Sequence, residues 1–236
     1  MAWSFHASGS GGNTAPGKTA LSTSASVAVN AGDLICLQAG WESSNGGTVT
    51  AGGATKNALT QLAMSNNGTL IYGCFFWLVA TDTITEVFTI NWTSGVTAPE
   101  IIVHVFTPTA GNTVSLDVGP SGGVGSGTAA ASGSVSPNGP ESLVFGSAYQ
   151  DNNGAGIGTF KIGADAADGS IISPSNLGAS WYKTGNTGSL TANCAVSNGS
   201  WLCDVISFKS VSGGGMPGYE ILKSNNPQIA MRRGGR

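Results

Sequence analysis

The sequence predicts an all-β protein of the β-sandwich or jelly-roll-like type, internally duplicated, with essentially no long helix and with an extended C-terminal arm. Three observations lead to this prediction. Short apolar runs alternate with turn-forming Gly, Asn, Ser and Pro at the spacing of many short strands. No stretch carries apolar residues at i, i+3, i+4 and i+7 over three turns, which is the pattern of a packed helix. One structural unit occurs twice, and a repeated unit indicates a repeated fold.

The repeated unit consists of a turn, an acidic residue, an apolar strand and a final aromatic residue. It occurs first at Ala31–Trp41 (AGDLICLQAGW) and again at Pro137–Tyr149 (PNGPESLVFGSAY). The acidic residue is expected to fix the turn, because Asp and Glu side chains accept hydrogen bonds from nearby backbone. The matched positions are Leu34–Leu37 with Leu143–Gly146, Asp33 with Glu141, and Trp41 with Tyr149.

Residues 1–118 are expected to form the first half of the sandwich. Ala2–Ala7 alternates Trp3, Phe5 and Ala7 with polar residues, as a half-buried strand does. The most apolar stretch, Leu70–Ala80 (LIYGCFFWLVA), predicts a central strand. Further strands are expected within Thr19–Asn30 and at Leu34–Trp41, Thr48–Ala51, Leu59–Met64, Thr83–Trp92, Ile101–Phe106 and Asn112–Val118.

Residues 119–133 are rich in Gly, Ala and Ser, which predicts a connection rather than a strand. Residues 134–211 are expected to form the second half, packed with the first. In this half Ala179–Tyr182 stands where Phe75–Trp77 stands, and Trp201–Phe208 stands where Ile101–Phe106 stands. The expected strands are Ser134–Ser136, Leu143–Tyr149, Thr159–Ile162, Ser180–Lys183, Ser189–Val196 and Trp201–Lys209.

Residues 212–236 are expected to extend from the body, because this segment is too short to bury much surface by itself. One interpretation is a frayed terminus. The other is an arm that packs on a neighbouring subunit through apolar anchors and arginine ion pairs. The arm residues would be Tyr219, Ile221, Leu222, Ile229, Arg232, Arg233 and Arg236.

The charge distribution argues against nucleic acid and membranes as partners. Charged residues make up 9% of the chain, against a usual share of about 25%. All three arginines lie in the last five residues, so Met1–Met231 carries six lysines against twelve acidic residues. Such a body does not attract nucleic acid or anionic lipid. The apolar run Cys74–Ala80 is too short to span a bilayer, and the N-terminus lacks the basic and apolar regions of a secretory signal.

Two cysteines flank a hairpin signal. Cys194 and Cys203 lie on either side of Asn198-Gly199, which is typical of a two-residue β-turn. A turn there would place the two cysteines opposite each other, within reach of a disulfide. Two reduced thiols on neighbouring strands remain the alternative, as expected in a reducing compartment.

The motifs that suggest catalysis lack their usual context. Gly12–Thr19 matches the phosphate-binding loop G-x-x-x-x-G-K-[ST], but strand-like residues follow it where a helix is required. Gly119–Gly123 matches the G-x-S-x-G nucleophile elbow, but it lies in the expected connection. His6 and His104 are the two histidines, and His104 stands in an apolar strand. We therefore expect no catalytic residue and no cofactor.

A few polar and aromatic residues leave further alternatives open. Oxygen-rich loops at Asp151 and Asp165 could hold calcium, although ordinary turns have the same composition. Glu86 and Glu100 could form a glycosidase pair, against the alternative of solvated strand residues. Aromatic side chains at strand ends could stack on sugar rings, against the alternative of core residues. The candidates for sugar stacking are Trp41, Trp92, Trp201 and Tyr149.

The strand series resembles duplicated β-sandwich, jelly-roll-like proteins of tailed-bacteriophage virions and bacterial surfaces. The resemblance rests on AGDLICLQAGW, Ala51–Asn57, LIYGCFFWLVA, IIVHVF, ESLVFGSAY and WLCDVISFK, and it covers Ala2–Ser210. It implies a non-enzymatic virion structural protein, such as a capsid decoration, head-fibre or tail component. Such a protein would assemble in the host cytoplasm as a homo-oligomer in contact with other virion subunits. The alternative is an adhesive module that binds host surface glycans.

Overall fold

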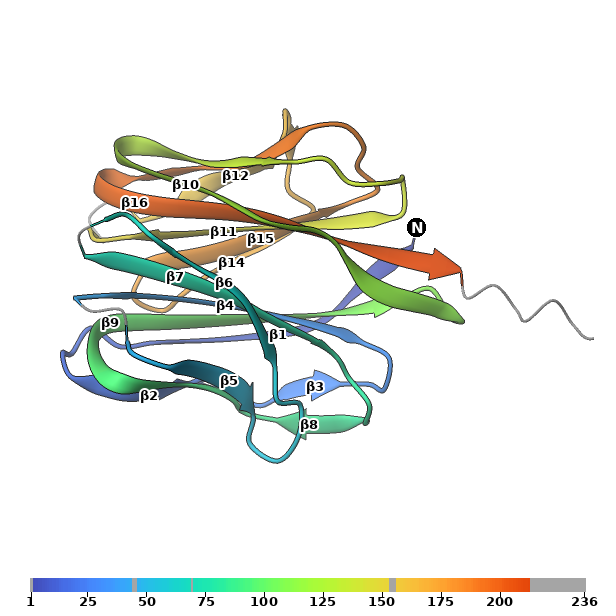
Figure 1. Ribbon diagram of the computed structural model, residues 1–236, viewed down its shortest axis with the longest axis horizontal. Helices are drawn as coiled ribbons and strands as arrows, with labels where there is room; N and C mark the ends of the chain where they lie inside the picture. The colour runs from blue at the N-terminus through green and yellow to red at the C-terminus, as the bar shows by residue number, and fades with distance from the viewer. Residues whose placement is uncertain (1, 44–45, 69, 153–155, 213–236) are drawn as a thin grey trace, which may run out of the picture.

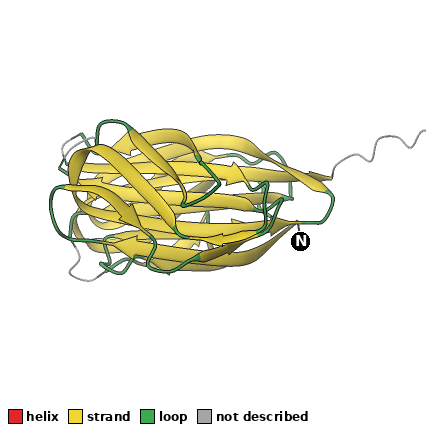
Figure 2. Ribbon diagram, turned by 90° about the horizontal axis from the view of Figure 1, so that it is seen from below, coloured by secondary structure: helices red, strands yellow, loops and turns green. Residues whose placement is uncertain are grey.

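The computed structural model describes residues 2–43, 46–68, 70–152 and 156–212, and these residues form strands and turns without a helix. The all-β prediction is therefore confirmed (Figure 1). Seen from below, the strands run along the length of the body (Figure 2). The arm proposed for residues 212–236 lies outside the described residues from position 213 onward.

The first half is a sandwich of two layers. Its inner sheet has the strand order β1-β9-β4-β7-β6, and its outer layer holds β2 and β5 on either side of the early part of β9. Strand β9 belongs to both layers, because its first residues pair with β2 and β5 and its last residues pair with β1 and β4. The strands are β1 (Trp3–Gly12), β2 (Lys18–Ser22), β3 (Val27–Val29), β4 (Leu34–Glu42), β5 (Val49–Gly53), β6 (Thr60–Asn66), β7 (Ile71–Val79), β8 (Ile84–Glu86) and β9 (Phe88–Pro108).

The second half repeats this plan. Strand β16 runs from the outer to the inner layer as β9 does, while β11, β15 and β14 take the places of β4, β7 and β6. Strand β12 pairs with the early part of β16, as β5 pairs with that of β9. The strands are β10 (Asn112–Val135), β11 (Ser142–Gln150), β12 (Gly158–Ile162), β13 (Asp165–Ala166), β14 (Gly169–Ile172), β15 (Gly178–Thr184) and β16 (Leu190–Ser212).

The register confirms the centre of the sequence repeat and corrects both of its ends. Leu34 pairs with Phe106 as Leu143 pairs with Phe208, so the match of Leu34–Leu37 with Leu143–Gly146 is right. Counted from this pair, however, Ser142 stands at the position of Asp33, and Gln150 stands at the position of Trp41. Because the side-chain period of a strand is two, a slip of one residue moves a side chain to the opposite face. The positions matched wrongly are Glu141 with Asp33 and Tyr149 with Trp41.

The predicted connection at residues 119–133 is wrong, because these residues lie inside β10 and pair with β16. Small residues suit this strand because β10 doubles back on itself, so that Gly123 lies against the backbone of Ala131 (Figure 1). The boundary between the halves falls instead at the short turn between β9 and β10.

The hairpin expected at Asn198-Gly199 is also absent, because β16 continues through these residues. Cys194 pairs with Ala130 of β10, and Cys203 pairs with Ala148 of β11, so the two cysteines are not opposed across a hairpin. Their side chains nevertheless interact directly: burial raises the pKa of the Cys203 thiol, and its contact with Cys194 raises it further. Both are buried free thiols in the core of the second half.

The two inner sheets face each other and share an apolar layer. Strand β4 is buried on both faces: Leu37 points into the core of the first half, while Leu34 and Cys36 point toward the second half. We call this shared layer the inter-half core. Its buried members are Trp3, Leu34, Cys36, Phe75, Phe106, Leu143, Phe145, Ile206 and Phe208.

Candidate functional site

The four aromatic residues proposed for sugar stacking are buried, so that expectation is wrong. Trp41 and Tyr149 are 0% exposed, Trp92 is 3% exposed and Trp201 is 9% exposed. Trp41 stacks on Tyr72 with ring centroids 6.0 Å apart. The reason is the layered architecture: Trp41 and Trp92 point into the core of the first half, Trp201 points into the core of the second half, and Tyr149 is enclosed between the halves.

The catalytic motifs occupy strands and the turns between them. Gly12–Thr19 runs from the end of β1 into β2, and no helix follows it in the described chain. Gly119–Gly123 lies within β10. Over the described residues there is no group of three or more His, Cys, Asp or Glu side chains that could hold a metal ion. The same residues contain no helix capable of crossing a membrane.

The two glutamates proposed as a glycosidase pair are buried in separate environments. Glu86 is 4% exposed and accepts hydrogen bonds from the backbone of Thr55 and Lys56 and, at 2.6 Å, from Asn57 Nδ2. Glu100 is 0% exposed and accepts a hydrogen bond from Ser175 Oγ in the other half. Glu86 therefore ties down a loop and Glu100 lies between the halves, so neither is the solvated strand residue of the alternative interpretation.

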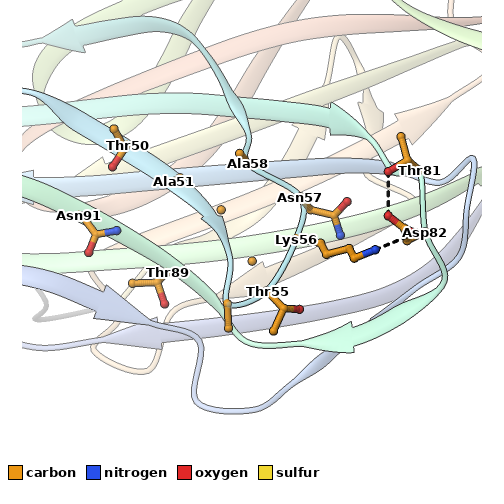
Figure 3. A pocket seen from close by; sticks show the side chains of 13 residues that line it. Thr50, Ala51, Thr55, Lys56, Asn57, Ala58, Thr81, Asp82, Thr89 and Asn91 are labelled. Carbon is orange, nitrogen blue, oxygen red and sulfur yellow. Dashed lines mark hydrogen bonds and ion pairs between the residues drawn. The ribbon is translucent and has the colours of Figure 1, made fainter.

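A wide polar hollow lies on the outer layer of the first half (Figure 3). Its volume is about 770 Å³, and no aromatic side chain lines it. At its rim Lys56 Nζ lies 3.1 Å from Asp82 Oδ1, and the loop beside them is held by the buried Glu86. The lining residues are Thr50–Ala58, Thr81, Asp82, Thr89 and Asn91.

A second depression, which we call the junction cleft, lies where β1 of the first half meets β15 of the second. Phe5 is 45% exposed and stacks on Tyr182, with ring centroids 5.8 Å apart and planes 7° from parallel. Two hollows adjoin this pair, of about 560 and 270 Å³. The first is also lined by Ala2–Ser4, Pro140, Asp168, Thr184 and Gly185, and the second by Ser8, His104 and Gly169–Ile171.

A β-bulge at His6 sets the direction of Phe5. The pairing of β1 with β9 shifts between Phe5 and Ala7, so His6 is an extra residue on β1. As a result Phe5 contacts Phe106 and Tyr182 between the halves, whereas Ala7 packs on the core of the first half. The simple alternation expected for Ala2–Ala7 is therefore wrong, because a bulge reverses the face of every later residue.

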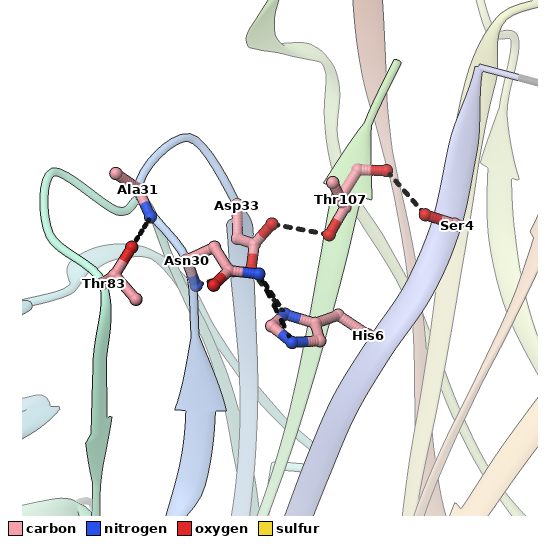
Figure 4. Close-up of polar contacts among 7 residues, drawn as sticks. All are labelled: Ser4, His6, Asn30, Ala31, Asp33, Thr83 and Thr107. Atoms are coloured by element: carbon pink, nitrogen blue, oxygen red, sulfur yellow. Dashed lines mark hydrogen bonds and ion pairs between the residues drawn. The ribbon is translucent and has the colours of Figure 1, made fainter. Parts of the chain in front are cut away.

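Asp33 fixes this bulge as well as its own turn (Figure 4). Its carboxylate is 1% exposed and accepts hydrogen bonds from the Asn30 backbone N–H at 2.8 Å and from Thr107 Oγ1 at 2.6 Å. His6 Nδ1 lies 2.6 Å from Asp33 Oδ2. Glu141, the residue matched to it in the sequence, is exposed, and its backbone carbonyl accepts a hydrogen bond from Trp3 Nε1. The turn role expected for the acidic residue thus holds for Asp33.

His104, Glu100 and Asp204 are buried titratable groups between the halves. Burial lowers the pKa of His104 to about 3 and raises the pKa of Glu100 to about 8. Burial also raises the pKa of Asp204 to about 6, although a hydrogen bond from Ser65 Oγ opposes this shift. His104 Nε2 lies 2.7 Å from Ser180 Oγ across the junction. These polar contacts give the inter-half region a specific register in addition to its apolar packing.

The carboxylates of the loops considered for calcium binding form hydrogen bonds and ion pairs with other residues of the chain. Asp151 accepts a hydrogen bond from the backbone of Ser200, and residues 153–155 of that loop lie outside the described chain. Asp165 lies 3.9 Å from Lys183 Nζ, and Asp168 accepts hydrogen bonds from Thr184.

No established protein-family model matches the chain, and no curated protein matches it at a significant level. The junction cleft was not predicted from the sequence. The sequence predicts that Phe5 lies in a half-buried strand, and no signal in it distinguishes Phe5 from Trp3, because the two residues share one face of β1 and differ only in how the second half packs against them.

Proposed function

We propose that the protein is a non-enzymatic structural subunit of a tailed-phage virion, serving as a capsid decoration, head-fibre or tail component. The observation that supports this proposal most is the inter-half core, because it joins two sandwiches into one body. A subunit that packs in a shell or fibre benefits from such a body, whose shape is maintained by buried contacts rather than by a ligand.

The chemistry of the described residues is consistent with this role. His6 is held by Asp33, and His104 is buried with a pKa lowered to about 3, so both histidines contribute to the fold. The low share of charged residues, 9%, suits a surface that contacts other subunits. The C-terminal segment, which holds Tyr219 and the three arginines, is proposed to contact neighbouring subunits.

Particle association tests this function. Phage particles are purified on a density gradient from cells that supply either the full chain or a chain that ends at Ser212. We expect the full chain to co-purify with the particles and the shortened chain to be depleted. Absence of the full chain from particles, while it is abundant in the lysate, would refute the virion role. Equal incorporation of both chains would refute only the contact role of the C-terminal segment.

A second candidate function, saccharide binding, is favoured by the exposed ring of Phe5 beside the hollows of the junction cleft. It is compatible with the first, because a virion subunit can also attach to glycans of the host surface. The aromatic residues that the sequence suggested for sugar stacking are buried, so we assign saccharide binding to the junction cleft instead.

A further inference from the structure

We propose that the junction cleft is a saccharide-binding site in which one sugar ring lies against Phe5 and its hydroxyl groups contact Asp168, Tyr182 and Thr184. This inference rests on the second candidate function and assigns it a site. It is independent of the virion role.

The aromatic platform is the first part of the argument. Phe5 is 45% exposed, although its neighbours Trp3 and Phe106 are buried. The nearly parallel ring of Tyr182 supports Phe5 on one side, so a ligand that stacks on Phe5 loses little side-chain entropy. The C–H face of a pyranose is apolar and flat enough to cover such a ring.

The bulge at His6 is the second part. Without this extra residue, Phe5 and Ala7 would lie on the same face of β1, as alternate strand residues do. Bulges are frequent beside functional sites because they redirect one side chain. Here the bulge is anchored by the buried Asp33, so the direction of Phe5 is fixed by the fold.

The third part is the set of polar groups around the platform. Asp168 Oδ2 accepts hydrogen bonds from the Thr184 N–H at 2.8 Å and from Thr184 Oγ1 at 2.9 Å, and Asp168 Oδ1 lies 3.5 Å from Lys183 Nζ. The carboxylate is thus preorganised at the wall of the first hollow, and its remaining lone pairs can accept hydrogen bonds from sugar hydroxyls. The hydroxyl group of Tyr182 adds a donor and acceptor.

These polar groups decide between two classes of occupant. An apolar peptide would cover Phe5 equally well, but it would remove water from Asp168 and Thr184 without replacing their hydrogen bonds, which is costly. A saccharide covers the ring and satisfies the polar wall at the same time. The first hollow, about 560 Å³, falls in the size range of small-ligand sites.

The second hollow is lined by a buried histidine. His104 is 0% exposed and lines this hollow, and its Nδ1 atom has no hydrogen-bond partner among the described residues. Its Nε2 atom faces Ser180 Oγ at 2.7 Å, so His104 forms part of the floor of this hollow beneath Phe5 and ties the two halves together there. The position of His104 on β9 corresponds to Ile206 on β16, so the second half has no equivalent group there.

Glycan binding by matched variants tests the site. The purified full chain is applied to an array of trisaccharides of glucose, galactose, N-acetylglucosamine and rhamnose, and the strongest binders are measured by titration calorimetry. We expect Phe5→Ala and Asp168→Asn each to weaken binding at least tenfold. Leu70→Ala, which removes another exposed apolar side chain, is expected to leave binding unchanged. Thermal denaturation verifies that each variant is folded. If Phe5→Ala is unfolded, the site is tested by Asp168→Asn alone.

The outcomes separate the site from the function. Saccharide binding by the wild type that is equal in Phe5→Ala and Asp168→Asn would overturn the assignment of the cleft while retaining glycan binding. Absence of binding by the wild type to every trisaccharide on the array would overturn both the site and the second candidate function. Loss of binding in the two cleft variants alone supports the proposal.

Discussion

Gly40 provides a direct probe of the contact between the two halves. A Cβ atom at this position of β4 would lie 2.6 Å from Tyr149 Cγ and 2.9 Å from Tyr149 Cβ of β11. Carbon atoms that are not bonded do not approach so closely, so Gly40→Ala requires the sheets or the ring to move. The Tyr149 side chain cannot move aside freely, because it is 0% exposed and its hydroxyl group donates a hydrogen bond of 2.6 Å to the Ala98 carbonyl.

The expected cost of Gly40→Ala follows from these two contacts. Insertion of a methyl group into a packed core costs about 1–3 kcal/mol, and loss of the buried hydrogen bond of Tyr149 adds about 1 kcal/mol. We expect the free energy of unfolding to fall by about 2–4 kcal/mol. In a chain of this size the corresponding decrease in melting temperature is about 5–15 °C.

Thermal and urea denaturation of matched variants measure this effect. Gly119→Ala is the control, because a Cβ at Gly119 meets no atom within 4 Å and the residue also lies in a strand. The free energy of unfolding of this control is expected to lie within about 0.5 kcal/mol of the wild-type value. If Gly40→Ala proved as stable as Gly119→Ala, the packing of Tyr149 against β4, and with it the described contact of the halves, would be wrong.

Three further outcomes are expected. Burial raises the pKa of Glu100 from 4.5 to about 8, so between these pH values the folded chain keeps a proton that the unfolded chain releases. The free energy of unfolding should therefore fall as pH rises from 4.5 toward 8, by at most about 5 kcal/mol. Glu100→Gln should flatten this part of the pH profile in urea denaturation, and an unchanged profile would exclude Glu100 as its source. Asp33→Ala should lower the free energy of unfolding by about 2–4 kcal/mol, because its buried hydrogen bonds are lost. Glu141→Ala removes an exposed side chain and should lower the free energy of unfolding by less than about 0.5 kcal/mol. Equal decreases in the two variants would contradict the anchoring role of Asp33. All four cysteines should react with Ellman's reagent in denaturant and none in the native state, whereas only two reactive thiols in denaturant would indicate a disulfide.

The fold class and the duplication could be predicted because they depend on local pattern. The apolar strands Leu34–Leu37 and Leu143–Gly146 keep their register in the structure, since residues in the middle of central strands are fixed by neighbours on both sides. The strand at residues 119–133 was missed because Gly, Ala and Ser are typical of linkers. Here they form a strand because β16 supplies the hydrogen bonds and the close layers require small side chains.

The candidate site could not be predicted for a related reason. A tryptophan at the end of a strand is exposed in a single sheet, but Trp41 lies in a sheet that is covered on both faces. Conversely, Phe5 looks like an ordinary inward residue, but the bulge at His6 turns it away from the face of Ala7, and the packing of Tyr182 against it leaves part of its ring exposed. Both outcomes depend on which strands pack together, and the local sequence does not contain that information.

Differential scanning calorimetry of the full chain tests most directly the claim that the two sandwiches form one body. The shared inter-half core should make both halves unfold together, in one transition whose calorimetric and van 't Hoff enthalpies agree. The expected enthalpy is about 150 kcal/mol near 60 °C. Two resolved transitions, or a calorimetric enthalpy about twice the van 't Hoff value, would show that the halves unfold independently and would contradict the account.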